Sequence, residues 1–272
     1  MVRIVCIVIC VVLLCPCVAA AEDRYVAITF DDGPSGHFTS DLLEGLSERG
    51  VQATFFLCGY RIDQFPTLAA RIAAEGHEIG AHGDTHSYFS DLSPMELCRE
   101  LRAAVRKIEN ITGIRPKLLR PPGGLFDLQG LRESTCSDLS VILWSVDPED
   151  WCCSNSETIA ERVTGKVKSG DIILLHDMSD SSVQAAFKII DRLQAQGFRF
   201  VSVSELARLS GTKLEGGQSY HSFSFAKNAS ISFREAATEP CTKAGFPPPL
   251  PCKVAFRRRD RSRTSPFLHP MA

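Results

Sequence analysis

Short apolar runs alternate with amphipathic segments from about Tyr25 to Ser210. The runs have the length and composition of buried strands. We expect seven strands, at Tyr25–Phe30, Val51–Leu57, His77–Ala81, Lys117–Arg120, Leu139–Val146, Asp171–His176 and Phe198–Val203.

The segments between these runs carry apolar residues at the spacing of a helical face. One helix has a clear beginning, because Ser93 precedes Pro94 and Glu96 follows three residues after the serine, which is a capping box with proline at the first helical position. Strand and helix alternating over this length predict an α/β fold with a mostly parallel sheet or barrel, whose chemistry gathers at the carboxyl ends of the strands. Other helices are expected at Thr39–Arg49, Phe65–Ala73, Glu157–Val167 and Ser181–Gln196.

The first 21 residues have the layout of a secretory signal peptide. Arg3 gives a positive start, Ile4–Val18 is almost wholly apolar, and Ala19–Ala21 offers a small-residue cleavage site. An uncleaved anchor is the alternative, but the run is shorter than the ~20 residues of a spanning helix and contains Pro16. We therefore expect an exported protein, extracellular or associated with the cell wall, without a membrane span after cleavage.

The 272 residues are enough for one large domain with an extension. We expect the domain at 24–210. Residues 211–272 are rich in Lys and Arg, contain Pro247–Pro249 and show no clear period, which predicts a flexible extension and leaves a wall-binding role open. The formal net charge of −2 gives no reason to expect nucleic acid as a partner.

Carboxylates and imidazoles follow the first and third expected strands. Asp31 and Asp32 end the first, and because neighbouring strand residues point to opposite sides, one can bind a metal while the other acts as a base. His82 and His86 follow the third, and two imidazoles with three residues between them can reach one ion. Two histidines and one carboxylate would leave a position for water or substrate, as in a catalytic metal site.

Further polar residues end three later strands. Arg120 begins the rigid sequence Arg-Pro-Pro-Gly-Gly, in which a backbone amide could face a developing oxyanion. Asp147, Asp150 and Trp151 follow the next strand, and His176 ends the one after it. Each cluster alone is a weak signal, but all five would converge on one face.

This ordered set resembles the polysaccharide deacetylases of the NodB-homology type, carbohydrate esterase family 4. The resemblance covers roughly Arg24 to Ser210 and includes the five motifs of that family in order. It implies a distorted (β/α) barrel of about seven parallel strands. It also implies one divalent metal ion, usually Zn²⁺, for which Co²⁺, Mn²⁺ or Ni²⁺ could substitute.

The resemblance assigns roles around the ion. Asp31 is similar to the catalytic base of the family, and Arg120 to the arginine that orients that base. The metal ligands that it implies are Asp32, His82 and His86.

It also assigns roles toward the substrate. His176 is similar to the general acid, and Asp150 to the carboxylate that holds it. Trp151 matches an aromatic wall of the sugar groove and Leu174 the lining of the acetate pocket. The backbone N–H of Gly123 would bind the oxyanion, although the family commonly has tyrosine at this position.

The resemblance and the expected export favour a polysaccharide as substrate, with peptidoglycan N-acetylglucosamine first. N-acetylmuramic acid residues, chitin oligosaccharides and exopolysaccharide stay open, as does an O-acetyl ester or a small sugar. An inactive carbohydrate-binding relative would have lost one of the site residues, and none is lost. A wall-attached structural protein would leave the five motifs unexplained.

Overall fold

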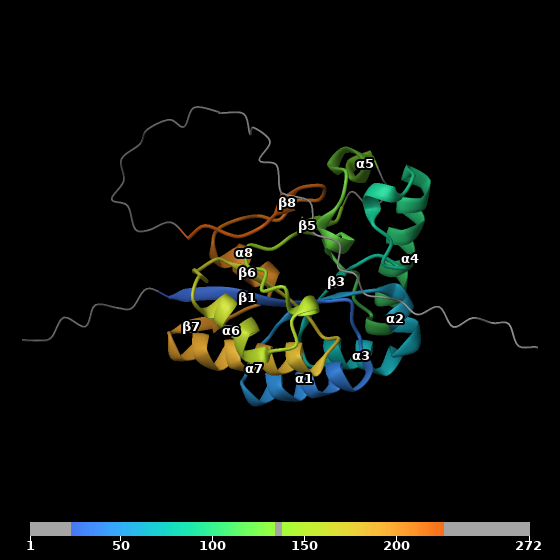
Figure 1. Ribbon diagram of the computed structural model, residues 1–272. Helices are drawn as coiled ribbons and strands as arrows, with labels where there is room; N and C mark the ends of the chain where they lie inside the picture. Colours follow the sequence, from blue (N-terminus) through green and yellow to red (C-terminus); the bar gives the residue numbers. More distant parts are fainter. Residues whose placement is uncertain (1–22, 134–137, 226–272) are drawn as a thin grey trace, which may run out of the picture. The chain divides into compact units, whose positions relative to one another are not determined.

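The computed structural model describes residues 23–225 apart from 134–137 (Figure 1). The expected signal segment, 1–21, and residues 226–272 of the expected extension lie outside the described residues. Across the described part of the chain, no helix has the length and apolar character needed to span a bilayer.

The described strands form one sheet in the order β6-β1-β2-β3-β4-β5-β8, and β7 also pairs with β1. Every ladder between named strands is parallel, which confirms the predicted α/β architecture. The strands are β1 (Arg24–Asp31), β2 (Thr54–Leu57), β3 (Glu78–Ala81), β4 (Leu118–Leu119), β5 (Ser140–Ile142), β6 (Ile172–His176), β7 (Phe198–Phe200) and β8 (Ser219–Tyr220).

Helices lie on both sides of β1 (Figure 1). In the figure α1, α3, α6 and α7 lie along one side of β1, and α8 lies on the other side. The helices are α1 (Gly36–Glu48), α2 (Gly59–Gln64), α3 (Pro66–Ala74), α4 (Pro94–Thr112), α5 (Leu128–Glu133), α6 (Ser156–Thr164), α7 (Asp180–Ala195) and α8 (Val203–Leu209). Three short 3₁₀ turns are η1 (Phe89–Asp91), η2 (Pro122–Gly124) and η3 (Asp150–Cys152).

The alternation of side chains along β1 separates core from site. Val26, Ile28 and Phe30 belong to the larger hydrophobic core. Thr29 and Asp31 therefore face the other side of the sheet. In the parallel register Thr29 lies opposite Leu174, and Asp31 lies opposite His176. The sheet thus places the last residues of β1 and β6 side by side.

The capping box predicted at Ser93 is present. Its hydroxyl accepts from the backbone N–H of Glu96, and the Glu96 carboxylate accepts from the backbone N–H of Ser93. Gly113 ends α4 with a φ of 71°, a conformation that glycine adopts without steric cost.

The structure differs from the predicted elements near the end of the domain. We expected a strand through Val203, but α8 begins there because Ser202 Oγ accepts from the backbone N–H of Glu205 and caps the helix. We also expected the domain to end near Ser210. The packed region continues beyond it, since β8 pairs with β5 and Phe223 is buried.

Candidate active site

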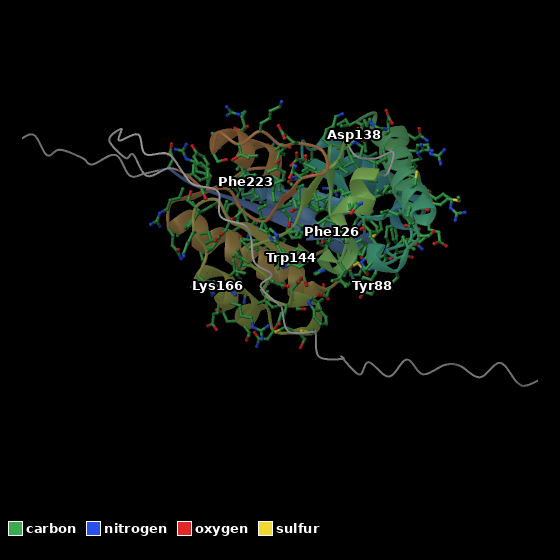
Figure 2. All side chains as sticks on the ribbon, turned by 90° about the horizontal axis from the view of Figure 1, so that it is seen from above. Tyr88, Phe126, Asp138, Trp144, Lys166 and Phe223 are labelled. Carbon is green, nitrogen blue, oxygen red and sulfur yellow. The ribbon has the colours of Figure 1, made fainter. Side chains whose placement is uncertain are left out.

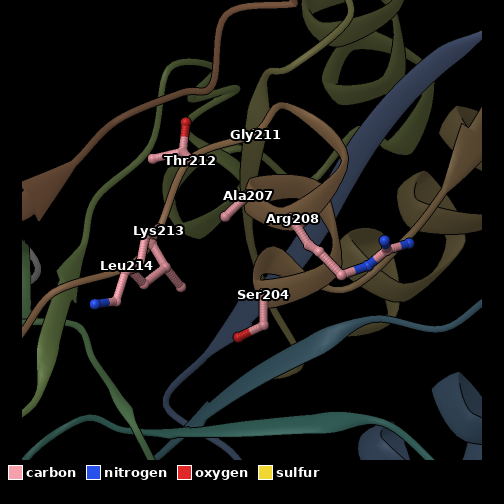
Figure 3. Close-up of a pocket in the computed structure, with 7 residues that line it drawn as sticks. All are labelled: Ser204, Ala207, Arg208, Gly211, Thr212, Lys213 and Leu214. Atoms are coloured by element: carbon pink, nitrogen blue, oxygen red, sulfur yellow. The ribbon is translucent and has the colours of Figure 1, made fainter.

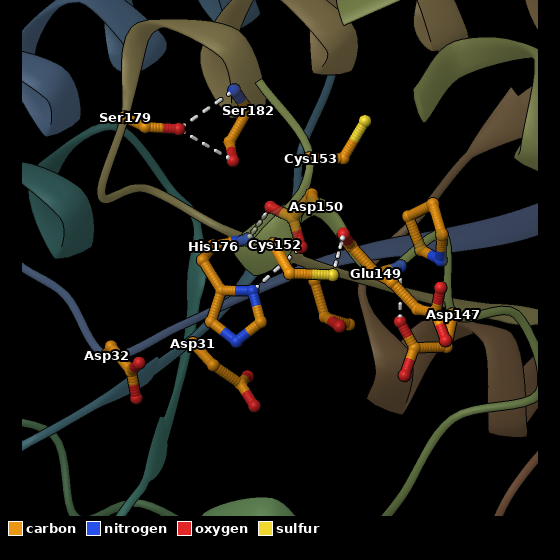
Figure 4. A network of polar contacts seen from close by, with 12 residues as sticks. Asp31, Asp32, Asp147, Glu149, Asp150, Cys152, Cys153, His176, Ser179 and Ser182 are labelled. Carbon is orange, nitrogen blue, oxygen red and sulfur yellow. Dashed lines mark hydrogen bonds and ion pairs between the residues drawn. The ribbon is translucent and has the colours of Figure 1, made fainter. Parts of the chain in front are cut away.

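The carboxyl ends of β1, β3 and β6 bring together the carboxylates and imidazoles singled out from the sequence. Asp31 ends β1 and His176 ends β6. Asp32 and His82 directly follow β1 and β3. Figure 4 shows His176 between Asp150 on one side and the pair Asp31 and Asp32 on the other.

Asp32, His82 and His86 form a compact donor set. Asp32 Oδ1 lies 3.3 Å from His82 Nε2 and 3.0 Å from His86 Nε2. Ligands of a tetrahedral ion with bonds of about 2.0–2.1 Å are separated by about 3.4 Å, so this spacing fits one divalent ion. Asp32 Oδ1 is also buried and has no hydrogen-bond partner among the described residues. A bound cation would satisfy that oxygen.

A second contact sets the tautomer of His82. Its Nδ1 lies 2.7 Å from the backbone carbonyl oxygen of Arg120. A carbonyl only accepts, so Nδ1 carries the proton and the lone pair of Nε2 faces Asp32. This is the arrangement in which metal-binding histidines are usually held.

The charges of the donor set depend on one another. Burial opposes ionisation of Asp32, but the adjacent imidazoles of His82 and His86 outweigh it and hold the pKa of Asp32 well below its usual range. The interaction with Asp32 in turn raises the pKa of His86. The group therefore favours an ionised carboxylate, which is the form that binds a cation.

Backbone strain coincides with this cluster. Among the described residues, the non-glycine positions with positive φ are Asp32 (70°), His86 (64°) and Glu149 (55°). Such conformations cost of order 1–3 kcal/mol each and concentrate at functional sites. Two of the three are candidate ligands, and the third precedes Asp150.

The strain at Asp32 corrects one expectation. We expected Asp31 and Asp32 to point to opposite sides, but Asp31 Oδ2 lies 3.7 Å from His82 Nε2 and Asp32 Oδ1 lies 3.3 Å from the same atom. The alternation of a strand does not extend to Asp32, because its backbone is left-handed. Both carboxylates consequently face one site.

Arg120 is fully buried and holds Asp31. Its Nη1 donates to Asp31 Oδ1 at 2.8 Å and to Thr29 Oγ1 at 2.7 Å. Nε and Nη2 donate to the carbonyl oxygens of Ile142 and Leu143, each at 3.0 Å. Burial lowers the pKa of Arg120, and the adjacent Asp31 opposes that effect. A buried charge held by four hydrogen bonds is a rigid support for its partner.

Asp150 holds His176 through both carboxylate oxygens. Oδ2 accepts from the backbone N–H of His176 at 2.9 Å, and Oδ1 lies 2.8 Å from Nδ1. Burial works against the charged imidazole, but Asp150, with smaller contributions from Asp31 and Asp32, outweighs it and raises the pKa of His176 to about 9. Because Nδ1 is bound to Asp150, Nε2 is the nitrogen available to the site.

The residues predicted to contact substrate lie on β6 and on two adjoining loops. Leu174 is buried and shares a strand face with His176. Gly123 is exposed, with a φ of 61°. Trp151 is 57 % exposed. Gly123 and Trp151 are therefore accessible from solvent, whereas Leu174 is buried.

Two supporting residues were not singled out from the sequence. Thr29 Oγ1 donates to the carbonyl oxygen of Ile173 at 2.7 Å while accepting from Arg120. Asp177 is fully buried, binds the Thr39 hydroxyl, and its pKa is raised to about 7 by burial. The sequence does contain a signal for each residue. Thr29 is a hydroxyl residue in an apolar strand, two positions before Asp31, and Asp177 is a carboxylate directly after His176.

A separate hollow of about 480 Å³ lies beside α8 (Figure 3). It is lined by residues between Ser204 and Leu214. No histidine or carboxylate lines it, so the titratable cluster at the strand ends is the better candidate for chemistry.

Comparison with known proteins identifies the family of this cluster. Residues 19–135 match the polysaccharide deacetylase family. The chain is 40 % identical over 186 residues to a peptidoglycan-N-acetylmuramic acid deacetylase of Bacillus subtilis (strain 168), with 68 % of this chain and 39 % of that protein covered. It is 38 % identical over 192 residues to a peptidoglycan-N-acetylglucosamine deacetylase of Bacillus cereus, with 69 % and 90 % covered. The chain thus spans less than half of the first relative and most of the second.

A solved structure agrees with these matches. A family 4 acetyl xylan esterase from Clostridium thermocellum, in complex with a cobalt ion, superposes with a TM-score of 0.68 at 30 % identity, covering 73 % of this chain and 98 % of that one. The fold is therefore the distorted (β/α) barrel that the family resemblance implied. The chain belongs to the polysaccharide deacetylase family, carbohydrate esterase family 4.

Proposed function

We propose that the chain is a metal-dependent hydrolase that removes N-acetyl groups from amino sugars of a polysaccharide. The observation that carries the proposal is the convergence of three units at one end of the sheet. These are the donor set around Asp32, the Arg120–Asp31 pair and the Asp150–His176 pair.

Asp32, His82 and His86 would hold the ion. When bound, a divalent ion polarises the acetamide carbonyl and lowers the pKa of water. Two imidazoles and one carboxylate suit Zn²⁺, while Co²⁺, Mn²⁺ and Ni²⁺ accept the same ligands.

Asp31 would act as the general base. Arg120 and the geometry of β1 fix its carboxylate, with Oδ1 bound to Nη1 and Oδ2 on the side of His82. Oδ2 would accept a proton from the water that attacks the carbonyl carbon. The N–H of Gly123 would donate to the oxyanion that forms.

His176 would act as the general acid. Nδ1 is held by Asp150, so Nε2 would deliver the proton to the sugar nitrogen as the C–N bond breaks. The products are acetate and a free amino sugar. Leu174 would line the space for the acetyl methyl group, and Trp151 would face the sugar.

We propose peptidoglycan as the polymer and N-acetylglucosamine as the sugar. Both bacterial relatives support peptidoglycan through the activities that their names state, and the Bacillus cereus relative supports N-acetylglucosamine. The expected signal segment would bring the chain to the cell wall. N-acetylmuramic acid, chitin oligosaccharides and exopolysaccharide are the alternatives within the same chemistry.

The test is acetate release from N-acetylated peptidoglycan and from chitin oligosaccharides in parallel. We expect release that a chelator abolishes and Zn²⁺ restores, with the higher rate on peptidoglycan. A higher rate on chitin oligosaccharides would reassign the polymer. No release from either by folded, metal-loaded protein would contradict the proposed activity.

A further inference from the structure

Two loops of the site meet through Tyr88 and Gly123. Tyr88 lies in the segment after β3, and Gly123 lies in the turn η2 after β4. A Cβ atom built on Gly123 would lie 2.9 Å from Tyr88 Cε1, closer than side chains tolerate. The Tyr88 ring therefore occupies the space into which a side chain at position 123 would project.

The neighbouring glycine makes an equivalent contact. A Cβ atom on Gly124 would lie 3.0 Å from Trp144 Cη2. Both glycines have positive φ, 61° and 70°, which disfavours other residues at either position. Figure 2 labels the two rings, Tyr88 and Trp144, that pack against this turn. The aromatic rings of two residues outside this turn, Tyr88 and Trp144, thus pack against Gly123 and Gly124.

Tyr88 is held in place yet open to solvent. The next residue, Phe89, is 3 % exposed and packs in the main core. The backbone N–H of Asp91 donates to the carbonyl oxygen of Tyr88 at 3.1 Å. Tyr88 itself is 48 % exposed, and its ring centroid lies 6.5 Å from that of His86. An anchored aromatic ring beside a residue proposed to bind the metal is pre-organised to contact a molecule bound in the site.

We propose that Tyr88 is a substrate-contact residue, which supplies from the loop after β3 the aromatic surface that position 123 lacks. This inference rests on the proposed function for the identity of the ligand. That ligand is an oligosaccharide of amino sugars, either N-acetylated or free. Sugar rings present C–H groups that pack on an aromatic face, and an exposed ring gains most from such a contact. Trp151, on η3, would offer a second exposed ring.

The experiment is a double-mutant cycle in binding. The ligand is a glucosamine tetramer, the deacetylated product, which is not turned over. Its Kd is measured by calorimetry on the metal-loaded chain and on Tyr88→Ala, Gly123→Ala and the double variant. We expect Tyr88→Ala to weaken binding about tenfold. Gly123→Ala should weaken binding because its methyl group displaces the ring, and it should have a smaller effect when Tyr88 is already absent.

Three controls separate substrate contact from support of the loop. Tyr88→Phe keeps the ring and should bind within about twofold of the parent. Met95→Ala removes another apolar side chain, 72 % exposed, and should bind like the parent. Metal content is measured for each variant, since Tyr88 lies near His86, and a purely structural role would reduce it in Tyr88→Ala.

The outcomes also distinguish the inference from the proposed function. Unchanged tetramer binding by Tyr88→Ala, or effects of Tyr88→Ala and Gly123→Ala that simply add, would overturn the inference, and acetate release by the parent chain would still support the function. Binding that depends on Tyr88 without any acetate release would sustain the inference and contradict the function. A parent chain that neither binds nor deacetylates would overturn both.

Discussion

Arg120 Nη1 lies 2.8 Å from Asp31 Oδ1, and both side chains are almost completely excluded from solvent. The remaining donors of Arg120 bind Thr29 and two backbone carbonyl oxygens. The orientation of the proposed base is thus determined by a residue of the segment after β4, through bonds that leave the guanidinium little freedom.

Removing that guanidinium should destabilise the fold as well as the site. Arg120→Met leaves Asp31 buried without its partner, and breaking such a pair costs about 3–5 kcal/mol. We expect that loss in the free energy of unfolding, measured in urea on metal-free protein. Arg102→Met, at an exposed position of α4, should change it by less than about 0.5 kcal/mol. Equal stability of the two variants would show that the pair does not support the fold.

Metal binding should depend on the three proposed ligands. An ion that binds only the folded state raises the melting temperature by mass action. We expect Zn²⁺ to raise the melting temperature of the parent chain and of His37→Ala, an exposed histidine on α1. His86→Ala should lose most of this response. A full response in His86→Ala would remove that residue from the donor set.

The pKa of His176 gives a prediction for metal-free protein. Its pKa of about 9, above the ordinary value of about 6.5, means that the folded state binds the proton more tightly than the unfolded state. The resulting stability is fully present below pH 6.5 and is lost as pH rises through about 9. We expect the stability difference between the parent and Asp150→Asn to shrink over this interval, as followed by unfolding in urea at each pH. A difference that stays constant with pH would show that Asp150 does not act through the charge of His176.

Much of this site could be predicted because its residues sit at strand ends. Ile172–Leu175 is a continuous apolar run, Tyr25–Phe30 is interrupted only by Thr29, and parallel strands bring their carboxyl ends to one edge. The left-handed backbone of Asp32 could not be predicted, because aspartate adopts this conformation only occasionally and the apolar run before it indicates a strand. The two-residue strand Ser219–Tyr220 is too short to show a period and exists only through its pairing with β5.

The contact between Tyr88 and Gly123 could not be predicted from the sequence either. The sequence shows that Gly123 departs from the tyrosine common in the family. It does not indicate which residue occupies the space beside Gly123. Only the folded structure brings the loop after β3 against the turn after β4.

In the proposed mechanism, Asp31 serves as the base of a metal-dependent deacetylation. The most direct measurement is acetate release by metal-loaded Asp31→Asn, compared with Asp41→Asn, an exposed aspartate of α1, at equal zinc content. We predict a loss of about 10²–10⁴-fold in kcat for Asp31→Asn, with Zn²⁺ still bound, and parent activity for Asp41→Asn. Activity of Asp31→Asn within a few-fold of the parent would show that Asp31 is not the base.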